Sequence, residues 1–483
     1  MGQVVRKVYV ISDLHIGGAY PVPGSGDTRG FRLNTHVDVA TRFVTRLTAS
    51  ATAGVSLELV INGDIVDFLA ERSSSGPLWV PFSPDPDDAC AKLEAIVTRD
   101  RPFFDAIGAF LKAGHRLTLL LGNHDIELGL PPVRGKFASL LGIDGHSDYE
   151  FIDNDEAYVV GGALIEHGNR YDGFNMVDYD SLRRVSALMS RRQEPNNQYT
   201  FDAPPGSKMV AWVINPIKEQ YRFIDLLKPE NGAVVPLLLA LEPGARDLLG
   251  KVAVLGAEAD RDSKTLPALP PVGVPVSSAA TQALQTVVHT SLGARAIDYL
   301  QSLEHDLTGL ETKAASADAT ARLDFDRDRG LACLVLAHKS SDVQARLPAL
   351  LEAVRALQGD KTFDRSVETG VEYLNSARAL AQQGGFQVVT YGHTHLAKKV
   401  SLDNGAVYFN SGAWVDFMQF PPEIISGPSD VAESQLQSFV EAIAAGGLTP
   451  FVMFQPTYLR FDLDSTEHIV SADLYDYSET GSL

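Results

Sequence analysis

Short apolar runs alternate with amphipathic stretches through the first 125 residues. The apolar and β-branched residues in 6–12, 57–62 and 117–121 are typical of short buried strands. In 36–50, apolar residues return every three or four positions, which predicts a helix with Val37, Ala40, Phe43, Val44 and Leu47 on one face. Residues 87–113 predict a second helix with a break at Pro102. Strands and helices in alternation predict an α/β fold whose strands are at least partly parallel.

The strand pattern returns later in the chain. Residues 148–166 predict two strands around Gly161-Gly162, residues 386–391 another strand, and residues 456–475 two closing strands. Between 397 and 410, Asn404-Gly405 is a hairpin signal, because both residues tolerate the positive φ angles of a tight turn.

The segment at 173–385 differs from both flanks. It is mostly Ala, Leu, Glu, Arg and Gln with helical spacing, and a Pro- and Ser-rich stretch at 258–281 predicts a loop within it. We therefore expect a core built from two parts of the chain, 1–172 and 386–483, with a mainly helical insertion at 173–385.

Charge and cysteine content narrow the class of protein. The 483 residues include 41 Lys and Arg against 61 Asp and Glu, a net charge of −20, so bulk duplex nucleic acid is not an expected partner. Two distant cysteines, Cys90 and Cys333, predict neither a disulfide framework nor a thiolate metal site, which fits a reducing cytoplasm. The apolar stretch at 232–244 is shorter than the roughly 18 residues of a transmembrane helix, so no membrane span is expected.

Five of the apolar segments end in residues that can bind a metal. These ends are Asp13-Leu14-His15, Gly63-Asp64, Gly122-Asn123-His124-Asp125, His167-Gly168-Asn169 and Gly392-His393-Thr394-His395. In open α/β sheets, ligands bind outside the carboxyl ends of the strands, so these loops could converge on one spot. Their nitrogen and oxygen donors suit Mn, Fe, Zn or Co rather than Ca. Two such cations about 3.5–4 Å apart can grip the oxygens of an in-line phosphoryl displacement.

In this order, the motifs resemble those of the calcineurin-like metallophosphoesterases: D-x-H, G-D-x-x-D, G-N-H-D, H-G and G-H-x-H. The resemblance covers residues 6–172 and about 386–415. It implies a four-layer α/β/β/α sandwich and two divalent metal ions, with Mn²⁺ favoured over Fe, Zn or Co. The implied ligands of the first metal are Asp13, His15, Asp64 and His395. Those of the second are Asp64, Asn123, His167 and His393, so that Asp64 bridges the pair.

The same resemblance gives His124 a catalytic role. Adjacent residues in a tight turn cannot easily all face one metal, which agrees with leaving His124 out of the ligand set. A hydroxide between the metals would attack phosphorus, while His124 stabilises charge on the phosphoryl oxygens or protonates the leaving group. Asp125 is expected to orient His124, as a carboxylate commonly does for a working imidazole.

Two further positions near the motifs have more than one interpretation. Asp67, three residues after Asp64, is expected to cap the next helix or to support a ligand, and we favour support. Asn410-Ser411-Gly412 follows an apolar strand and is either a simple turn or part of the surroundings of the site.

Substrate contacts are expected from the segment that follows His167. The run HGNRYDGFN (167–175) is similar to a segment of bacterial UDP-diacylglucosamine pyrophosphohydrolases and places Asn169, Arg170, Tyr171, Asp172 and Asn175 beside the second metal. Arg170 could grip a phosphate with two parallel hydrogen bonds. Arg184 and Arg191 share one face of the next predicted helix, and Arg184 is a further candidate contact for an anionic substrate.

Together these features predict a cytoplasmic metal-dependent phosphoesterase. Its expected substrate is a small or medium-sized phosphorylated molecule with a phosphodiester, pyrophosphate or phosphomonoester bond. A nuclease or cyclic-nucleotide phosphodiesterase, a protein phosphatase and a non-catalytic metal-binding module remain as alternatives. The sequence leaves the natural substrate and the oligomeric state open.

Overall fold

The computed structural model describes most of the chain outside the central segment. The described residues are 3–18, 31–72, 79–196, 198–218, 223–228, 347–444 and 449–481, with the single positions 255, 258, 259, 261, 262 and 483. They form a mixed α/β structure with two large sheets and one short strand pair, as the alternation of strands and helices predicted.

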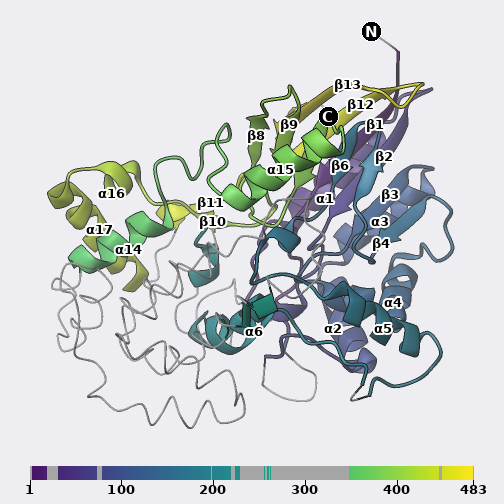
Figure 1. Cartoon of the computed structure of the whole chain (residues 1–483), viewed down its shortest axis with the longest axis horizontal. Coiled ribbons are helices and arrows are strands. Elements are labelled where there is room, and N and C mark those ends of the chain that lie inside the picture. Colours follow the sequence, from purple (N-terminus) through teal and green to yellow (C-terminus); the bar gives the residue numbers. More distant parts are fainter. Residues whose placement is uncertain are drawn as a thin grey trace.

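The first sheet has six strands in the order β13-β12-β1-β2-β3-β4. Their bounds are β1 Val4–Ile11, β2 Ser56–Asn62, β3 Arg116–Leu120, β4 Tyr149–Ile152, β12 Thr457–Asp464 and β13 Ile469–Asp476. Strands β1 to β4 are parallel, whereas β12 and β13 join antiparallel at one edge. The yellow β12–β13 hairpin therefore lies beside the purple β1, so the two ends of the chain share one sheet (Figure 1).

The second sheet has five strands in the order β5-β6-β7-β9-β8. Their bounds are β5 Tyr158–Val160, β6 Ala163–Ile165, β7 Val388–Tyr391, β8 Lys398–Ser401 and β9 Val407–Asn410. Strands β6, β7 and β9 are parallel, and β8 and β9 form the predicted hairpin, with Gly405 at a φ of 82°. A two-strand ladder joins β10 (Phe417–Met418) to β11 (Val452–Met453).

The predicted strands are confirmed, and the structure adds the short β10–β11 pair and one strand within 148–166. Residues 148–166 were expected to hold two strands, and they hold three, because β4 joins the first sheet before the β5–β6 hairpin enters the second. Burial of β4 is only partial, which explains why its apolar pattern is weak.

Helices from the first part of the chain cover one face of the first sheet. Their bounds are α1 Val37–Ala49, α2 Pro86–Arg99, α3 Arg101–Lys112 and α4 Pro131–Leu141. The five apolar residues predicted for one face of α1 are all buried, and each large side chain contributes about 1.5–3 kcal/mol by leaving water. The predicted break near Pro102 is confirmed: α2 ends before Asp100, and Pro102 stands in the first turn of α3, where its missing N–H costs no helical bond.

The two sheets share an apolar core. Side chains of the first sheet (Val8, Val10, Val60, Leu120, Leu459, Phe461 and Leu463) cluster with side chains of the second (Tyr158, Val160, Ala163, Ile165, Val388 and Phe409). The opposite face of the second sheet is covered by α15 (Val371–Gln383), whose Tyr373, Ala377 and Ala381 are buried with Val389, Tyr391 and Tyr408. Strands β1, β2, β3 and β7 therefore have apolar contacts on both faces, which fixes where their carboxyl ends lie.

The remaining described elements are mainly helical. Their bounds are α5 Tyr179–Met189, α6 Pro205–Met209, α7 Asn215–Lys218, α14 Leu347–Leu357, α16 Pro422–Ser426 and α17 Ser429–Ala444, with a π-helical turn at Val210–Ile214 and 3-10 turns at Phe68–Ala70, Ile126–Gly129, Asn169–Tyr171, Ile224–Leu226 and Thr449–Phe451. Helices α14, α16 and α17 pack together in one apolar cluster. The apolar stretch at 232–244 and most of the expected helices between 229 and 346 lie outside the described residues. So does the predicted loop at 258–281, except for residues 258, 259, 261 and 262, which are helical. Within the described part of the chain, no helix is both long and apolar enough to cross a membrane.

Candidate metal centre

The loops after β1, β2, β3, β6 and β7 meet at the carboxyl ends of both sheets. Backbone hydrogen bonds join them: the Asp13 N–H donates to the Gly63 carbonyl at 3.2 Å, and the Gly392 N–H donates to the His167 carbonyl at 2.9 Å. The His393 N–H donates to both carboxylate oxygens of Asp13, at 3.1 and 3.0 Å. The His393 main chain is therefore held against the side chain of Asp13, 380 positions away.

Five of the seven predicted ligands have left-handed backbones. The φ angles are 52° at Asp13, 43° at His15, 53° at Asp64, 65° at His393 and 63° at His395. This region costs a non-glycine residue about 1–3 kcal/mol, and such residues concentrate at functional sites. The fold therefore maintains a strained conformation at the positions that the motifs single out.

Two motif glycines are required because other groups come very close. A Cβ atom at Gly122 would lie 2.1 Å from Asp64 Oδ1, and one at Gly63 would lie 2.3 Å from His167 Nδ1. Any side chain at these positions would displace Asp64 or His167. The glycines of the G-N and G-D motifs thus make room for the functional side chains.

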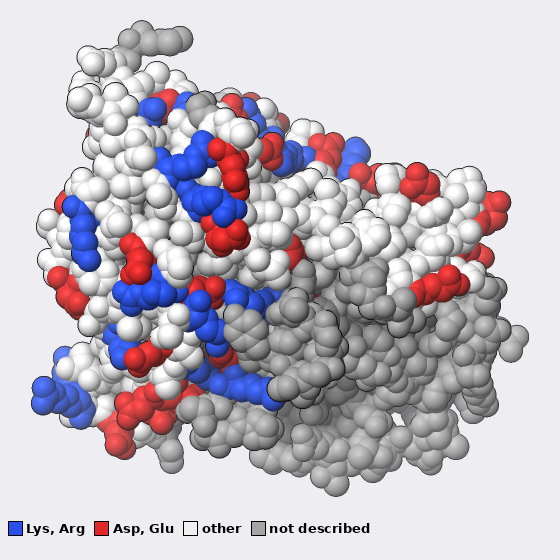
Figure 2. Space-filling model, turned by 180° about the vertical axis from the view of Figure 1, so that it is seen from behind, with Lys and Arg blue, Asp and Glu red and all other residues white. Residues whose placement is uncertain are grey.

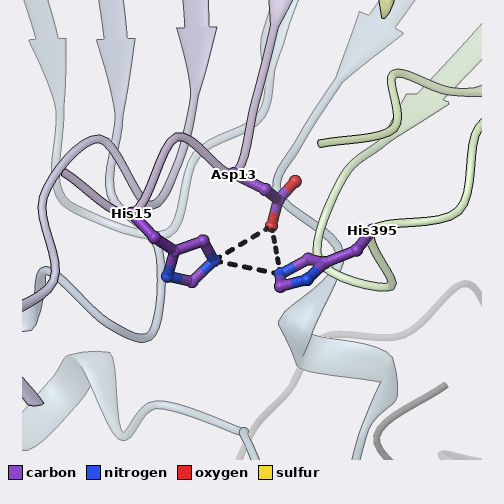
Figure 3. Close-up of side chains that lie close together, drawn as sticks. All are labelled: Asp13, His15 and His395. Carbon is purple, nitrogen blue, oxygen red and sulfur yellow. Dashed lines mark hydrogen bonds and ion pairs between the residues drawn. The ribbon is translucent and has the colours of Figure 1, made fainter. Parts of the chain in front are cut away.

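Asp13, His15 and His395 form a first group (Figure 3). The Nε2 atoms of His15 and His395 are 3.0 Å apart, and His395 Nε2 lies 3.3 Å from Asp13 Oδ1. All three side chains are buried, and the Nδ1 atoms of both histidines have no hydrogen-bond partner. Two imidazole nitrogens and a carboxylate oxygen thus point at one small volume, as the ligands of a cation do.

Asp64, His167 and Asn123 form a second group beside the first. His167 Nε2 lies 3.2 Å from Asp64 Oδ2 and 3.2 Å from Asn123 Oδ1, while the other ring nitrogen of His167 bonds the Asn62 carbonyl at 2.8 Å. A bond from one nitrogen to a carbonyl fixes the imidazole tautomer and leaves the other nitrogen for the site, as in many metal centres. Asp64 also lies 3.6 Å from His15 Nε2, so its carboxylate stands between the two groups.

The charges in the centre favour a cation. Burial raises the pKa of Asp64, but the charge and hydrogen bond of His167 outweigh it and hold that pKa well below its usual value. Burial lowers the pKa of His167, but the neighbouring Asp64 raises it to about 10. Burial and the positive charge of Lys228 lower the pKa of His395 to about 4, so this imidazole is neutral at pH 7 and keeps the lone pair that a metal ion requires.

The donor set fits two divalent cations. Asp13, His15, Asp64 and His395 could hold one, and Asp64, Asn123 and His167 could hold the other, with His393 nearby, its ring centroid 5.5 Å from that of His167. All of these donors are nitrogen or oxygen atoms, as expected for Mn, Fe, Zn or Co. The fit rests on the close approach of the His15 and His395 Nε2 atoms, 3.0 Å apart, and on the carboxylates of Asp13 and Asp64, buried beside them.

His124 lies next to the first group, and Asp67 holds its ring. The centroids of the His124 and His15 rings are 4.6 Å apart, and His124 Nδ1 is 3.1 Å from Asp67 Oδ1. Asp67 also caps the turn at Phe68–Ala70 through the Ala70 N–H, which confirms the capping interpretation. It lies 3.7 Å from His15 Nδ1, so its support of a ligand stays a prediction.

The orienting role predicted for Asp125 is wrong. Its two carboxylate oxygens accept the backbone N–H groups of Gly122 and Ile65, at 2.7 and 2.8 Å. Burial and the nearby Asp64 raise the pKa of Asp125 to about 8. Asp125 thus shapes the loop after β3, whereas Asp67 orients His124.

Arg170 and Tyr171, two of the predicted substrate contacts, bond to carboxylates of the protein itself. Arg170 pairs with Asp155 and lies 3.4 Å from Glu166 Oε2, so buried carboxylates already occupy its guanidinium. The Tyr171 hydroxyl donates to Glu166 Oε1 at 2.6 Å, and its ring packs in the apolar cluster under α15. Both side chains therefore fix the loop after β6 through their bonds to neighbouring carboxylates.

The other two candidate substrate contacts, Asn169 and Arg184, lie in different surroundings. Asn169 is buried and donates to the Asn175 carbonyl at 2.9 Å, which makes it part of the loop scaffold. Arg184 is exposed on α5, whose opposite residues Leu182 and Val185 are buried in the core. The structure therefore gives Arg184 no place in the gathered groups.

Three residues near the centre received no individual role from the sequence. Asp172 Oδ2 lies 3.1 Å from His393 Nε2, and Asn175 Oδ1 accepts from Asn123 Nδ2 at 3.3 Å. Both belong to the HGNRYDGFN run, so their position was visible but their partners were not. Lys228, buried and charged beside His395, comes from the insertion, where no motif marks it. Asn410 and Ser411 do join the surroundings of the site, through Gly392 and Ser12.

The chain was compared with known protein families and with curated proteins. No model of a known protein family matches the chain, and no curated protein matches it.

Proposed function

We propose that the chain is a metal-dependent phosphoesterase of the calcineurin-like type. One observation carries the proposal: side chains from five strand ends, predicted as ligands from the motifs, gather as two neighbouring buried groups with Asp64 between them. The arrangement of helices, two sheets and α15 is consistent with the four-layer α/β/β/α sandwich that the resemblance implies.

Each side chain of the centre has a task in phosphoester hydrolysis. Two divalent cations, when bound, would activate water and neutralise charge on the phosphoryl oxygens. Asp13 and Asp64 supply the negative charge that retains them, and His395, neutral at pH 7, supplies a lone pair. The strained loops hold these donors in place before substrate arrives, so little reorganisation is needed during reaction.

His124 is the imidazole best placed to act on substrate. Its side chain is 13% exposed, more than that of His15 or His167, which are almost fully buried. Because Asp67 holds Nδ1, Nε2 is the ring nitrogen that would donate to a phosphoryl oxygen or to the leaving group. This division of tasks separates metal retention from proton donation.

The surface favours a compact phosphorylated substrate over a long nucleic acid. On the face in Figure 2, lysine and arginine side chains are interspersed with acidic ones rather than gathered into an uninterrupted basic strip. With a net charge of −20, this distribution does not suit the phosphates of a duplex. A diester, pyrophosphate or monoester of moderate size is the substrate class that we propose.

A metal add-back assay tests the proposal. The full chain is stripped of metal, reloaded with Mn²⁺, and assayed with bis-p-nitrophenyl phosphate and p-nitrophenyl phosphate. We expect hydrolysis that requires metal, with the ratio of the two rates distinguishing diesterase from monoesterase. A protein that binds two Mn²⁺ ions yet hydrolyses no member of a phosphoester panel would be a non-catalytic metal-binding module. Salt-dependent affinity for DNA would instead favour the nuclease alternative.

A further inference from the structure

A chain of hydrogen bonds lies next to the second group, which consists of Asp64, His167 and Asn123. Asp172 and Asn175 lie in the loop that follows the 3-10 turn at Asn169–Tyr171. Asp172 Oδ2 lies 3.1 Å from His393 Nε2 and accepts from Asn175 Nδ2 at 2.7 Å. Asn175 Oδ1 in turn accepts from Asn123 Nδ2 at 3.3 Å. One carboxylate therefore connects two side chains that the motifs predict as ligands of the same metal.

The direction of each bond follows from Asp172. An ionised carboxylate only accepts hydrogen bonds, so the Asn175 amide must turn its NH₂ group toward Asp172. Its oxygen then faces Asn123, which must present its own NH₂ group in return. The oxygen of Asn123 is left pointing at His167 Nε2, 3.2 Å away, on the side of the second metal group. A metal ion binds an amide through oxygen, so this is the orientation that a ligand requires.

Asp172 imposes a similar choice on His393. With Nε2 facing the carboxylate, the proton of the neutral imidazole stays on Nε2, and the lone pair that could bind a metal belongs to Nδ1. The Phe174 N–H and the Asn175 amide both donate to Asp172, at 2.9 and 2.7 Å, so each of its carboxylate oxygens acts as an acceptor.

The segment that bears the two residues is itself fixed. The Phe174 N–H donates to Asp172 Oδ1 at 2.9 Å, and Asn169 Nδ2 donates to the Asn175 carbonyl at 2.9 Å. On the other side, a Cβ at Gly206 would lie 2.2 Å from Asn175 Oδ1, so α6 packs directly against the amide. These contacts leave the Asp172 and Asn175 side chains little freedom to turn.

We propose that Asp172 and Asn175 are positioning residues that set the donor atoms of the second metal site. Asp172 fixes the tautomer of His393, and through Asn175 it fixes the amide orientation of Asn123. This inference rests on the proposed function for the presence of the metal pair, and it adds a chemical role for the loop after His167.

Asp172→Asn is the sharpest test, because it changes no volume. An amide has one acceptor oxygen, and satisfying the Phe174 N–H would turn its NH₂ group toward the donors on Asn175 and His393. Asn175→Ala is a second variant that cuts the link to Asn123 but leaves Asp172 on His393. Asp178→Asn is the matched control, since Asp178 caps α5 through the Ser181 N–H and asparagine caps a helix equally well.

Mn²⁺ binding to the metal-stripped full chain is measured by calorimetry, and pairing of the two ions by electron paramagnetic resonance. We expect Asp172→Asn to bind its second Mn²⁺ roughly 10–100-fold more weakly and its first as the wild type does, with loss of the exchange-coupled signal. Asn175→Ala should show a smaller loss, and Asp178→Asn none.

Unchanged second-site affinity in both Asp172→Asn and Asn175→Ala would overturn the inference, and so would an equal loss at both sites. A wild type that binds two Mn²⁺ ions but hydrolyses no phosphoester would refute the proposed function and leave the positioning role standing. A wild type that binds no Mn²⁺ would overturn both.

Discussion

Two sets of polar residues follow strands in this protein, and the two sets have different bonding partners. The loops after β1, β2 and β7 hold Asp13, Asp64 and His395 on left-handed backbones, with their side chains turned toward one another. The loop after β6 carries Arg170 and Tyr171, whose polar groups are occupied by Asp155 and Glu166. Both sets are polar and follow a strand, but only the first set has left-handed backbones and side chains that face one another.

The two sets differ in what their side chains face. In the first set, like groups face each other at close range, as with the Nε2 atoms of His15 and His395, 3.0 Å apart, and a cation between them would bind to both. In the second set, opposite charges already neutralise each other. Bonding partners, rather than polarity, therefore distinguish the residues that we propose as metal ligands from those that hold the loop.

Asp64→Asn should show the largest effect in the first set. The change removes the charge that lies between the two groups, so we expect loss of metal and a fall in kcat of about a thousandfold or more, several kcal/mol of transition-state stabilisation. Metal content by mass spectrometry and steady-state kinetics measure the two effects. Retention of two metals at full rate would show that Asp64 is not a ligand.

His124→Ala should separate proton donation from metal retention. We expect kcat to fall by roughly 100- to 10,000-fold while both metals remain bound, since the motif resemblance leaves His124 out of the ligand set and Asp67 holds its Nδ1 atom, although His124 also lies within ligand distance of His15 and Asp64. The same two measurements apply. Loss of one metal along with the activity would place His124 in the ligand set.

Arg170→Met should test the second set through stability. Its guanidinium, 17% exposed, is paired with Asp155 and Glu166, so removal should cost about 3–5 kcal/mol of unfolding free energy with KM nearly unchanged. Arg184→Ala, at an exposed position of α5, is the control and should change stability by less than about 0.5 kcal/mol. Denaturant titration gives both values, and a raised KM at normal stability would restore Arg170 to substrate binding.

Glu127→Gln should give the smallest effect and a pH signature. Burial raises the pKa of Glu127 to about 7, with partial compensation from Lys92. Because the folded state keeps the proton more tightly than the unfolded state, ionising Glu127 destabilises the fold as pH rises from about 4.5 to 7. Glutamine removes this cost, so the variant should be about 1–3 kcal/mol more stable than wild type at pH 8 and little changed at pH 4. Equal pH profiles of unfolding free energy would contradict this assignment.

The sequence by itself determined the strands, the helices of the first part and the residues that gather. Strand and helix periodicities are local, and Val37 to Leu47 or the run before Gly122 show them within a few positions. The motif residues could be located because parallel strands bring their carboxyl ends to one edge, which follows from the fold class alone.

Only the tertiary structure decided which polar group bonds which. Asp67, 57 positions from His124, takes the ring that neighbouring Asp125 was expected to hold, and Asp172 reaches His393 across 221 positions. Such pairings depend on how closely loops from different strands approach one another. No local sequence pattern encodes that distance. Arg170 is a similar case. Its sequence context suggests a phosphate contact, but in the fold its guanidinium forms ion pairs with Asp155 and Glu166.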